Sequence, residues 1–157
     1  MMSEFTHLDD RGAAHMVDVS AKDVSVRTAT AAGRVVVNAD VIRLLRDEAL
    51  PKGDALAVAR IAGIMAAKRT PDLIPLCHPI ALHGIDVVLD VRDDGVDITA
   101  TVRTADRTGV EMEALTSVTV AALAFIDMVK AVDPAAVVTD VRVLTKTGGK
   151  SGDWSRP

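Results

Sequence analysis

Apolar and polar residues alternate along two neighbouring stretches in the middle of the chain, 82–92 and 96–107. A period of two places the apolar side chains on one face of a strand, and Asp93-Asp94-Gly95 between the stretches is a strong turn signal. The pattern therefore predicts an antiparallel hairpin. A β-branched run at 34–37 and a valine-rich run at 136–146 predict two more strands.

Three stretches carry the pattern and the end signals of helices. Asn38 can cap a short amphipathic helix that extends to residue 50, and Asp54 can cap a second helix from about 55 to 68, which is rich in alanine. The stretch from 111 to about 132 is apolar in its centre, begins with acidic residues and is followed by a proline. We expect two long helices and one short one.

The order of the main elements predicts the fold class. Strand, helix, strand, strand, helix, strand is the split βαβ arrangement, so we expect a single ferredoxin-like α+β domain with an antiparallel sheet over residues 1–157. Residues 1–30 are polar and lack periodicity, which favours an extended arm. Residues 147–157 are expected to form a flexible, glycine-rich tail.

Composition and charge restrict the partners. The net charge of -4, with one Trp, two Phe and no Tyr, argues against a nucleic-acid binder, which normally has a basic face and stacking aromatic residues. The N-terminal residues lack the order of a signal peptide, and no continuous apolar run reaches the roughly 18 residues of a membrane span. A single cysteine allows no internal disulfide. We expect a cytoplasmic protein, and its high apolar content favours self-association.

Charged residues stand at both ends of the 111–132 stretch. Asp127 and Lys130 are three residues apart, so they can touch on one helix face, and the lysine opposes the effect of the helix dipole on the carboxylate. Such a pair suits proton transfer, although an ordinary surface ion pair is the more common explanation of this spacing. Glu113 would lie roughly 21 Å from Asp127 along the axis, too far for one carboxylate pair within a subunit.

The segment around Cys77-His78 is a rigid loop fenced by prolines, because Pro71, Pro75 and Pro79 exclude regular helix and central strand. Adjacent residues on an extended segment point in opposite directions, so the cysteine and histidine do not form a nucleophilic dyad by themselves. The other histidines lack the spacing of metal ligands. A packed cysteine beside a loop histidine is the alternative to a catalytic pair.

The segment 146–152, KTGGKSG, looks like a nucleotide-binding P-loop, but the first glycine of that motif is missing. We therefore reject a nucleoside triphosphatase. A glycine-rich, lysine-bearing segment after a strand can still wrap phosphates with its amides. Six basic residues stand at element ends near Gly or Pro, where a shared anionic ligand and ordinary surface solubility are equally compatible with the pattern: Lys52, Lys68, Arg69, Lys130, Lys146 and Lys150.

Several strings resemble one family closely. The most specific are DLIPLCHP at 72–79 and TGVEMEALT at 108–116, supported by MVDVS at 16–20, KGD at 52–54 and GGKSG at 148–152. Together they resemble the cyclic pyranopterin monophosphate synthase family, known as molybdenum cofactor biosynthesis protein C, from about residue 6 to residue 154. The resemblance implies a ferredoxin-like homohexamer of three dimers with active sites between subunits.

The resemblance also implies the reaction. The family converts (8S)-3',8-cyclo-7,8-dihydroguanosine 5'-triphosphate into cyclic pyranopterin monophosphate and diphosphate, a phosphorus-oxygen lyase step of molybdenum cofactor biosynthesis. No tightly bound cofactor and no protein-held metal are implied, and any Mg²⁺ would arrive with the substrate triphosphate. A GTP 3',8-cyclase would supply the substrate.

The resemblance assigns roles to individual residues. Asp127 would be the catalytic acid or base and Lys130 its partner, and Lys52 and Lys146 would handle phosphates or proton transfer. Asp127, Lys130 and Lys52 form the implied catalytic group. The remaining substrate-binding residues implied are Leu76, Cys77, His78, Met112, Glu113, Lys68 and Arg27.

One residue departs from the family pattern. Ile126 stands where family members usually carry a tyrosine, so no phenol lies beside Asp127. Two alternatives to the enzyme remain: a regulator that binds nucleotide or pterin without turnover, and a structural assembly module. Retention of the charged residues disfavours the first, and the proline-fenced loop remains unexplained by the second.

Overall fold

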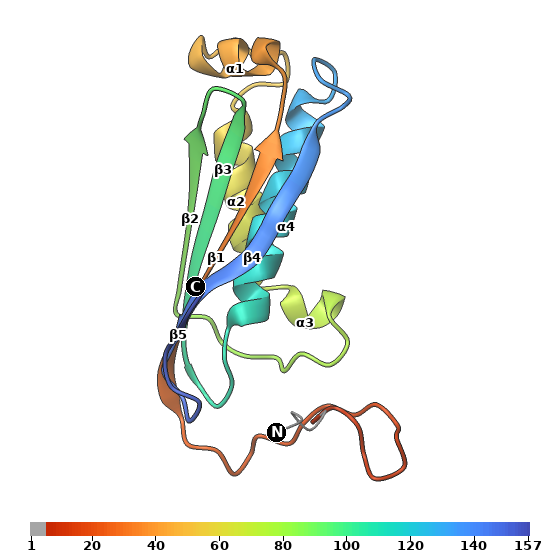
Figure 1. Cartoon of the computed structure of the whole chain (residues 1–157), viewed down its shortest axis with the longest axis vertical. Coiled ribbons are helices and arrows are strands. Elements are labelled where there is room, and N and C mark those ends of the chain that lie inside the picture. Colours follow the sequence, from red (N-terminus) through yellow and green to blue (C-terminus); the bar gives the residue numbers. More distant parts are fainter. Residues whose placement is uncertain (1–5) are drawn as a thin grey trace.

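The structure is a computed structural model that describes residues 6–157. A five-stranded antiparallel sheet forms one layer, and two long helices cover one of its faces (Figure 1). The elements are β1 (Ser25–Val36), α1 (Ala39–Arg46), α2 (Ala55–Ala67), α3 (Thr70–Leu73), β2 (Gly84–Val91), β3 (Gly95–Asp106), α4 (Glu111–Val129), β4 (Val137–Thr147) and β5 (Trp154–Ser155).

The strand order β2-β3-β1-β4-β5 is that of the split βαβ fold. β3 pairs antiparallel with both β1 and β2 and therefore lies between the two strands that α1 and α2 connect. β1 lies in turn between β3 and β4, the strands that α4 connects. The predicted ferredoxin-like α+β class is confirmed.

The expected helix caps form. The Asn38 side chain accepts a hydrogen bond of 3.0 Å from the Val41 amide, and the Asp54 side chain accepts one of 2.9 Å from the Ala57 amide. Each cap satisfies a backbone donor that the first helical turn leaves free. These two residues fix where α1 and α2 begin.

Four features differ from the prediction, and the first is that α1 ends at Arg46 rather than extending to residue 50. β1 begins at Ser25, so the expectation that residues 1–30 form an arm and that a strand starts at 34 is wrong for residues 25–33. Ala29 and Ala31 are weak strand formers, but both are buried, because small side chains allow close packing under the helices. The short helix α3 takes up the start of the proline-fenced loop, and β5 pairs two residues of the expected tail with β4.

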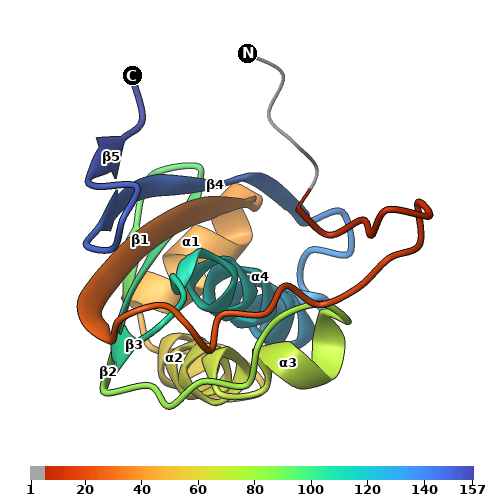
Figure 2. The same ribbon diagram turned by 90° about the horizontal axis from the view of Figure 1, so that it is seen from below.

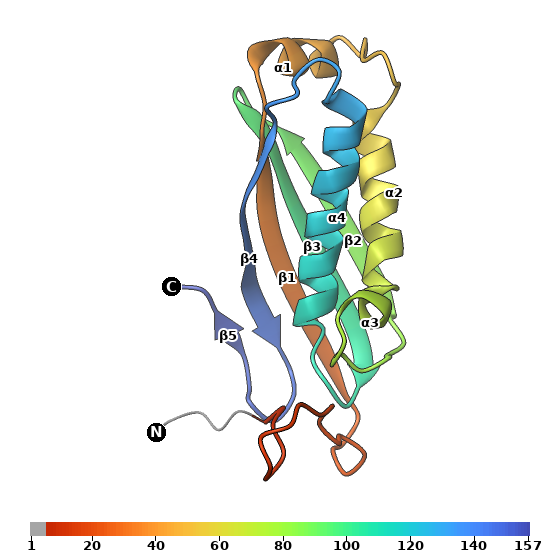
Figure 3. The ribbon, with the colours of Figure 1, turned by 90° about the vertical axis from the view of Figure 1, so that its right-hand side faces the viewer.

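α4 is the central element of the core. It lies beside α2 on the covered face of the sheet (Figure 3), where it packs against β1, β3 and β4, and Val118, Ala121 and Phe125 on it are completely buried. Its length and apolar character would suffice to cross a membrane, and it is the one helix of the described residues with that property. Half of its apolar window is buried inside this domain, as is typical of a core helix.

The segment before β1 runs across the end of the molecule at which α4 begins (Figure 2). Leu8 and Ala14 form an isolated bridge within this segment. His78 Nε2 donates a hydrogen bond to the Val17 carbonyl oxygen, which holds the segment against the proline-fenced loop. The start of α4 is therefore covered by parts of the chain that are far apart in sequence.

Candidate functional site

The C-terminal end of α4 carries a compact ionic cluster. Lys130 Nζ lies 2.7 Å from Asp127 Oδ1, as the three-residue spacing predicts. Lys52 Nζ approaches from the turn before α2 and lies 3.2 Å from Asp127 Oδ2 and 2.9 Å from the Asp127 carbonyl oxygen. The structure thus brings together the three residues that the sequence analysis grouped as catalytic.

Two lysines lower the pKa of the Asp127 carboxyl below its ordinary value. The hydrogen bond from Lys130 contributes most, followed by the one from Lys52. Asp127 is therefore ionised at neutral pH and can accept a proton, with ammonium groups beside it that can donate one. The cluster is open, since the Asp127 side chain is 57% exposed.

The other end of α4 faces a cavity of about 350 Å³. Its walls come from the N-terminal segment, the proline-fenced loop and the first turn of α4. Five of the predicted substrate-binding residues line it, namely Leu76, Cys77, His78, Met112 and Glu113. The structure therefore brings the predicted ring-binding residues together in one place, which we call the ring cavity.

Glu113 is the most perturbed acid of the described residues. It is 4% exposed, and burial raises its pKa from 4.5 to about 7, with a smaller contribution from the nearby charge of Glu111. Glu113 can therefore both donate and accept hydrogen bonds near neutral pH. Burial, and then the charge of Glu113, also raise the pKa of the Cys77 thiol, which disfavours the thiolate that a nucleophile needs.

A second cavity of about 210 Å³, the cationic cavity, lies between β1, the start of α4 and the glycine-rich loop after β4. Lys22, Arg27 and Lys146 line it. Arg27 Nε donates to the Asp106 carbonyl oxygen at 3.1 Å, which anchors the guanidinium. Lys146 Nζ lies 3.3 Å from Glu111 Oε1. Converging cations of this kind suit a polyphosphate.

The loop after β4 has a defined shape. Gly148 and Gly149 have φ values of +84° and +80°, which favour glycine, and a Cβ at Gly148 would overlap the Val26 carbonyl oxygen. The Gly148 amide donates to Asp153 Oδ1 at 3.0 Å. β5 then returns the chain along β4, with Arg156 Nε donating to the Val143 carbonyl oxygen at 2.7 Å.

The two cavities are adjacent and share part of their lining. Four residues line both of them: Lys22, Thr108, Gly109 and Glu111. A ligand with a ring at one end and phosphates at the other can therefore reach from the ring cavity into the cationic cavity.

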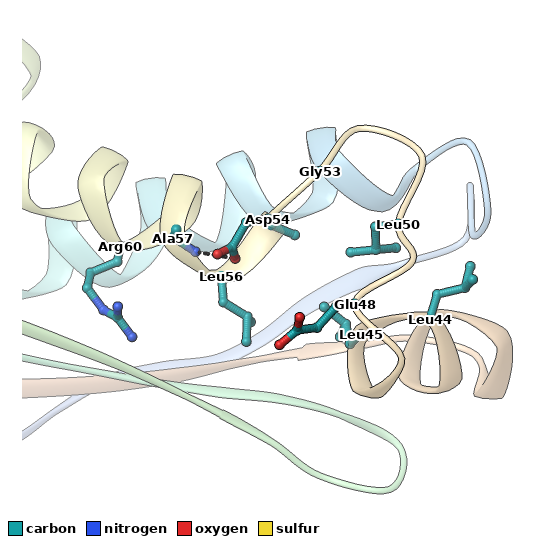
Figure 4. Close-up of a pocket in the computed structure, with 10 residues that line it drawn as sticks. Leu44, Leu45, Glu48, Leu50, Gly53, Asp54, Leu56, Ala57 and Arg60 are labelled. Carbon is teal, nitrogen blue, oxygen red and sulfur yellow. Dashed lines mark hydrogen bonds between the residues drawn. The ribbon is translucent and has the colours of Figure 1, made fainter.

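A larger cavity, of about 480 Å³, lies elsewhere, between α1 and the start of α2 (Figure 4). Leu44, Leu50 and Leu56 line it together with Glu48, and two of its polar side chains are engaged elsewhere. Asp54 caps α2, and Arg60 Nε donates to the Val87 carbonyl oxygen at 3.1 Å. It contains none of the predicted site residues.

The sequence-predicted residues thus fall into two groups on one chain. Asp127, Lys130 and Lys52 are at the C-terminal end of α4, and the ring and phosphate residues are at its N-terminal end. Lys68 belongs to neither group, because it lies at the C-cap of α2 and lines neither cavity.

Sequence reasoning missed two residues at the junction of the cavities, Lys22 and Glu111. Lys22 lies in the segment expected to be an arm, so only the folded chain reveals its position. Glu111 was visible as part of TGVEMEALT and as an acid in the first turn of a helix. Among residues 6–157, no group of three or more His, Cys, Asp or Glu could hold a metal ion.

Fold and site together define a ferredoxin-like protein with a ring cavity joined to a cationic cavity. The MoaC family model matches residues 16–149, and the chain belongs to that family. This match includes the proline-fenced loop, all of α4 and the first glycines after β4.

Relatives agree over nearly the whole chain. A protein of Streptomyces coelicolor named cyclic pyranopterin monophosphate synthase is 71% identical over 151 residues, which cover 96% of this chain and 89% of the relative. Cyclic pyranopterin monophosphate synthase 2 of Mycobacterium tuberculosis is 61% identical over 153 residues, covering 98% and 92%. The synthase of Corynebacterium glutamicum is 60% identical over 154 residues, covering 98% and 99%.

Proposed function

We propose that this chain is a lyase of molybdenum cofactor biosynthesis. It converts (8S)-3',8-cyclo-7,8-dihydroguanosine 5'-triphosphate into cyclic pyranopterin monophosphate and releases diphosphate. The observation that carries the proposal is the ring cavity joined to the cationic cavity, in a chain of the MoaC family. The two cavities match a substrate with a guanine-derived ring and a triphosphate.

The ring cavity binds the guanine-derived ring. Glu113 accepts or donates hydrogen bonds at the N–H edge of the ring, and its burial strengthens them, because a low dielectric strengthens polar contacts. Leu76, Cys77 and Met112 supply apolar contacts to the faces of the ring. His78, which also holds the N-terminal segment, lies where it can move a proton.

The cationic cavity binds the triphosphate. Arg27, Lys146 and the glycine-rich loop offer a guanidinium, an ammonium and backbone amides to the phosphate oxygens. These groups also stabilise the charge that grows on diphosphate as it leaves. No tightly bound cofactor takes part, and any Mg²⁺ accompanies the triphosphate.

The Asp127 cluster serves the ring cavity of a neighbouring subunit. Asp127 lines neither cavity of its own chain, and roughly 21 Å separates it from Glu113 along α4 by helix rise. An acid/base group must nevertheless reach the ring to open and rebuild it. A homohexamer built as three dimers supplies that group across each dimer interface.

Self-association is supported by an apolar stripe on the outer face of the helices. Val58, Ile61 and Met65 follow one face of α2, and all three are more than 40% exposed. Leu123 of α4 is exposed as well.

The enzyme acts in the cytoplasm beside the GTP 3',8-cyclase that supplies its substrate. Lys68 at the end of α2 contributes to substrate binding through a neighbouring subunit.

The test is product formation by purified protein supplied with the cyclised dihydro-GTP. We expect the wild type to release cyclic pyranopterin monophosphate and diphosphate, and Asp127→Asn to bind the substrate without turnover. Binding without turnover by the wild type would overturn the enzyme in favour of a regulator. Ile126→Tyr would then show whether the missing phenol is the reason.

A further inference from the structure

The cationic cavity contains one carboxylate. Among residues 6–157, Glu111 is the only acid that lines it, together with Lys22, Arg27 and Lys146. Its Oε1 lies 3.3 Å from Lys146 Nζ, and the two side chains are 30% and 32% exposed. A carboxylate in this place repels a polyphosphate and weakens ground-state binding. Its position therefore calls for a chemical role.

Gly109 provides the space for this carboxylate. A Cβ at Gly109 would overlap the Glu111 carboxyl group. The backbone of Gly109 does not have the positive φ that would require glycine for conformational reasons. Gly109 thus leaves room for the Glu111 carboxylate, and the ammonium of Lys146 holds it there.

Glu111 also lies at the junction of the two cavities, because it lines both. With the ring in one cavity and the triphosphate in the other, the α-phosphate is the phosphate nearest to the junction. The reaction of the proposed function forms the cyclic phosphate at the α-phosphorus. The carboxylate is therefore adjacent to the place where a substrate hydroxyl must lose its proton.

We propose that Glu111 is the general base of phosphate cyclisation, an inference that rests on the proposed function. The Glu111 carboxylate takes the proton of the substrate hydroxyl while the hydroxyl oxygen forms a bond to the α-phosphorus. The bond from the α-phosphorus to the oxygen that bridges to the β-phosphorus breaks, and this oxygen leaves with the electron pair as diphosphate. The proton then passes from Glu111 to solvent.

The surroundings of Glu111 favour this transfer. Lys146 holds the carboxylate at 3.3 Å before the reaction and can stabilise the phosphate oxygens during it. Besides Glu111, the charged or titratable groups that line the two cavities are Lys22, Lys146, Arg27, Cys77, His7, His78 and Glu113. A positioned general base typically accelerates a step by about 10²–10⁴-fold.

Glu111→Gln separates catalysis from binding. Glutamine keeps an acceptor for Lys146 but cannot take a proton, and it removes the charge that repels the triphosphate. We expect kcat for diphosphate release to fall by at least about 100-fold, with an unchanged or lower KM. Glu111→Asp, which keeps a carboxylate at the same position, recovers part of the rate.

Glu48→Gln makes the same chemical change on an exposed residue outside both cavities and keeps wild-type kinetics. A Glu111→Gln enzyme with a raised KM and a kcat within about threefold of the wild type would identify a residue that only positions Lys146, which overturns the proposal. Failure of the proposed function is a different result, because the wild type itself would then release no diphosphate.

Discussion

Glu113 links the ring cavity to the pH dependence of stability. Its pKa is raised from 4.5 to about 7, so the folded chain holds a proton that the unfolded chain releases at lower pH. The stability that Glu113 contributes is therefore fully present below about pH 4.5 and is lost as the pH rises to about 7. At 1.36 kcal/mol per pKa unit, this loss is on the order of 3 kcal/mol.

Glu113→Gln removes this loss, because glutamine stays neutral at every pH. We expect the variant to gain thermal stability relative to the wild type as the pH rises from 4.5 to 7, by roughly 5–10 °C in Tm. Thermal unfolding of both proteins across this range measures the effect. Glu48→Gln should show no such trend, and parallel curves for Glu113→Gln and the wild type would contradict the prediction.

Asp127 depends on its two lysines to unequal degrees. Lys130 lowers its pKa more than Lys52 does, consistent with ion-pair distances of 2.7 and 3.2 Å. Removal of either lysine should raise the pKa of the Asp127 carboxyl, and Lys130→Met should raise it further than Lys52→Met. The side-chain carboxyl signal, followed by NMR against pH, reports this pKa directly.

Arg43→Met is the matched control for these two variants. It breaks an exposed pair with Asp40 that has the same three-residue spacing, at 3.6 Å, and leaves Asp127 untouched. Equal pKa values of Asp127 in the Lys130 variant and the wild type would show that this contact is only an incidental surface pair.

At the scale of the elements, the crossing of α2 and α4 limits which residues fit. A Cβ at Gly63 would lie 3.0 Å from the Ser117 carbonyl oxygen and 3.1 Å from the Ala121 Cβ. Alanine favours a helix over glycine by about 1 kcal/mol, but overpacking typically costs about 1–3 kcal/mol. We therefore expect Gly63→Ala to lower the free energy of unfolding.

Denaturant unfolding measures this change, with Gly84→Ala as the control. A Cβ at Gly84 would meet only Arg103 side-chain atoms at 3.7 and 3.8 Å, which is ordinary contact. This variant should match the wild type within about 0.5 kcal/mol. A Gly63→Ala protein as stable as the control would contradict the prediction. It would mean that α2 and α4 can move slightly apart to accept the methyl group without a loss of stability.

The elements with strong local signals were predictable and the others were not. The 82–92 and 96–107 hairpin follows from alternation and a turn, and α2 and α4 follow from their end signals. The first half of β1 was missed because its alanines have weak strand propensity and gain from packing instead. β5 was missed because two residues become a strand only through pairing with β4.

The site was predictable in part. The contact of Asp127 with Lys130 follows from helix spacing, whereas the approach of Lys52 and the junction around Glu111 depend on tertiary structure. The ring-cavity residues came from a resemblance in sequence, and the structure places them around one cavity. Local periodicity alone would not have joined the loop at 76–78 to the start of α4.

At the scale of the whole molecule, the predicted site residues lie at opposite ends of α4. Whether two subunits share each active site can therefore be tested directly. A site built from two subunits takes Asp127 from one chain and Lys146 from the other. Asp127→Asn and Lys146→Met should each abolish most activity alone. In a mixed dimer, one site carries both changes and the other is intact, so exchange of subunits restores activity that neither variant has.

The expected recovery can be estimated. Random exchange in an equal mixture makes half of all dimers mixed, and half of their sites are intact, so roughly a quarter of wild-type activity returns. Diphosphate release after dissociation and reassembly of the mixture measures it, with each variant treated alone as the control. Recovery no greater than the mean of the two variants would show that one subunit supplies both Asp127 and Lys146 to a site. That site would then have to use residues from both ends of the same α4.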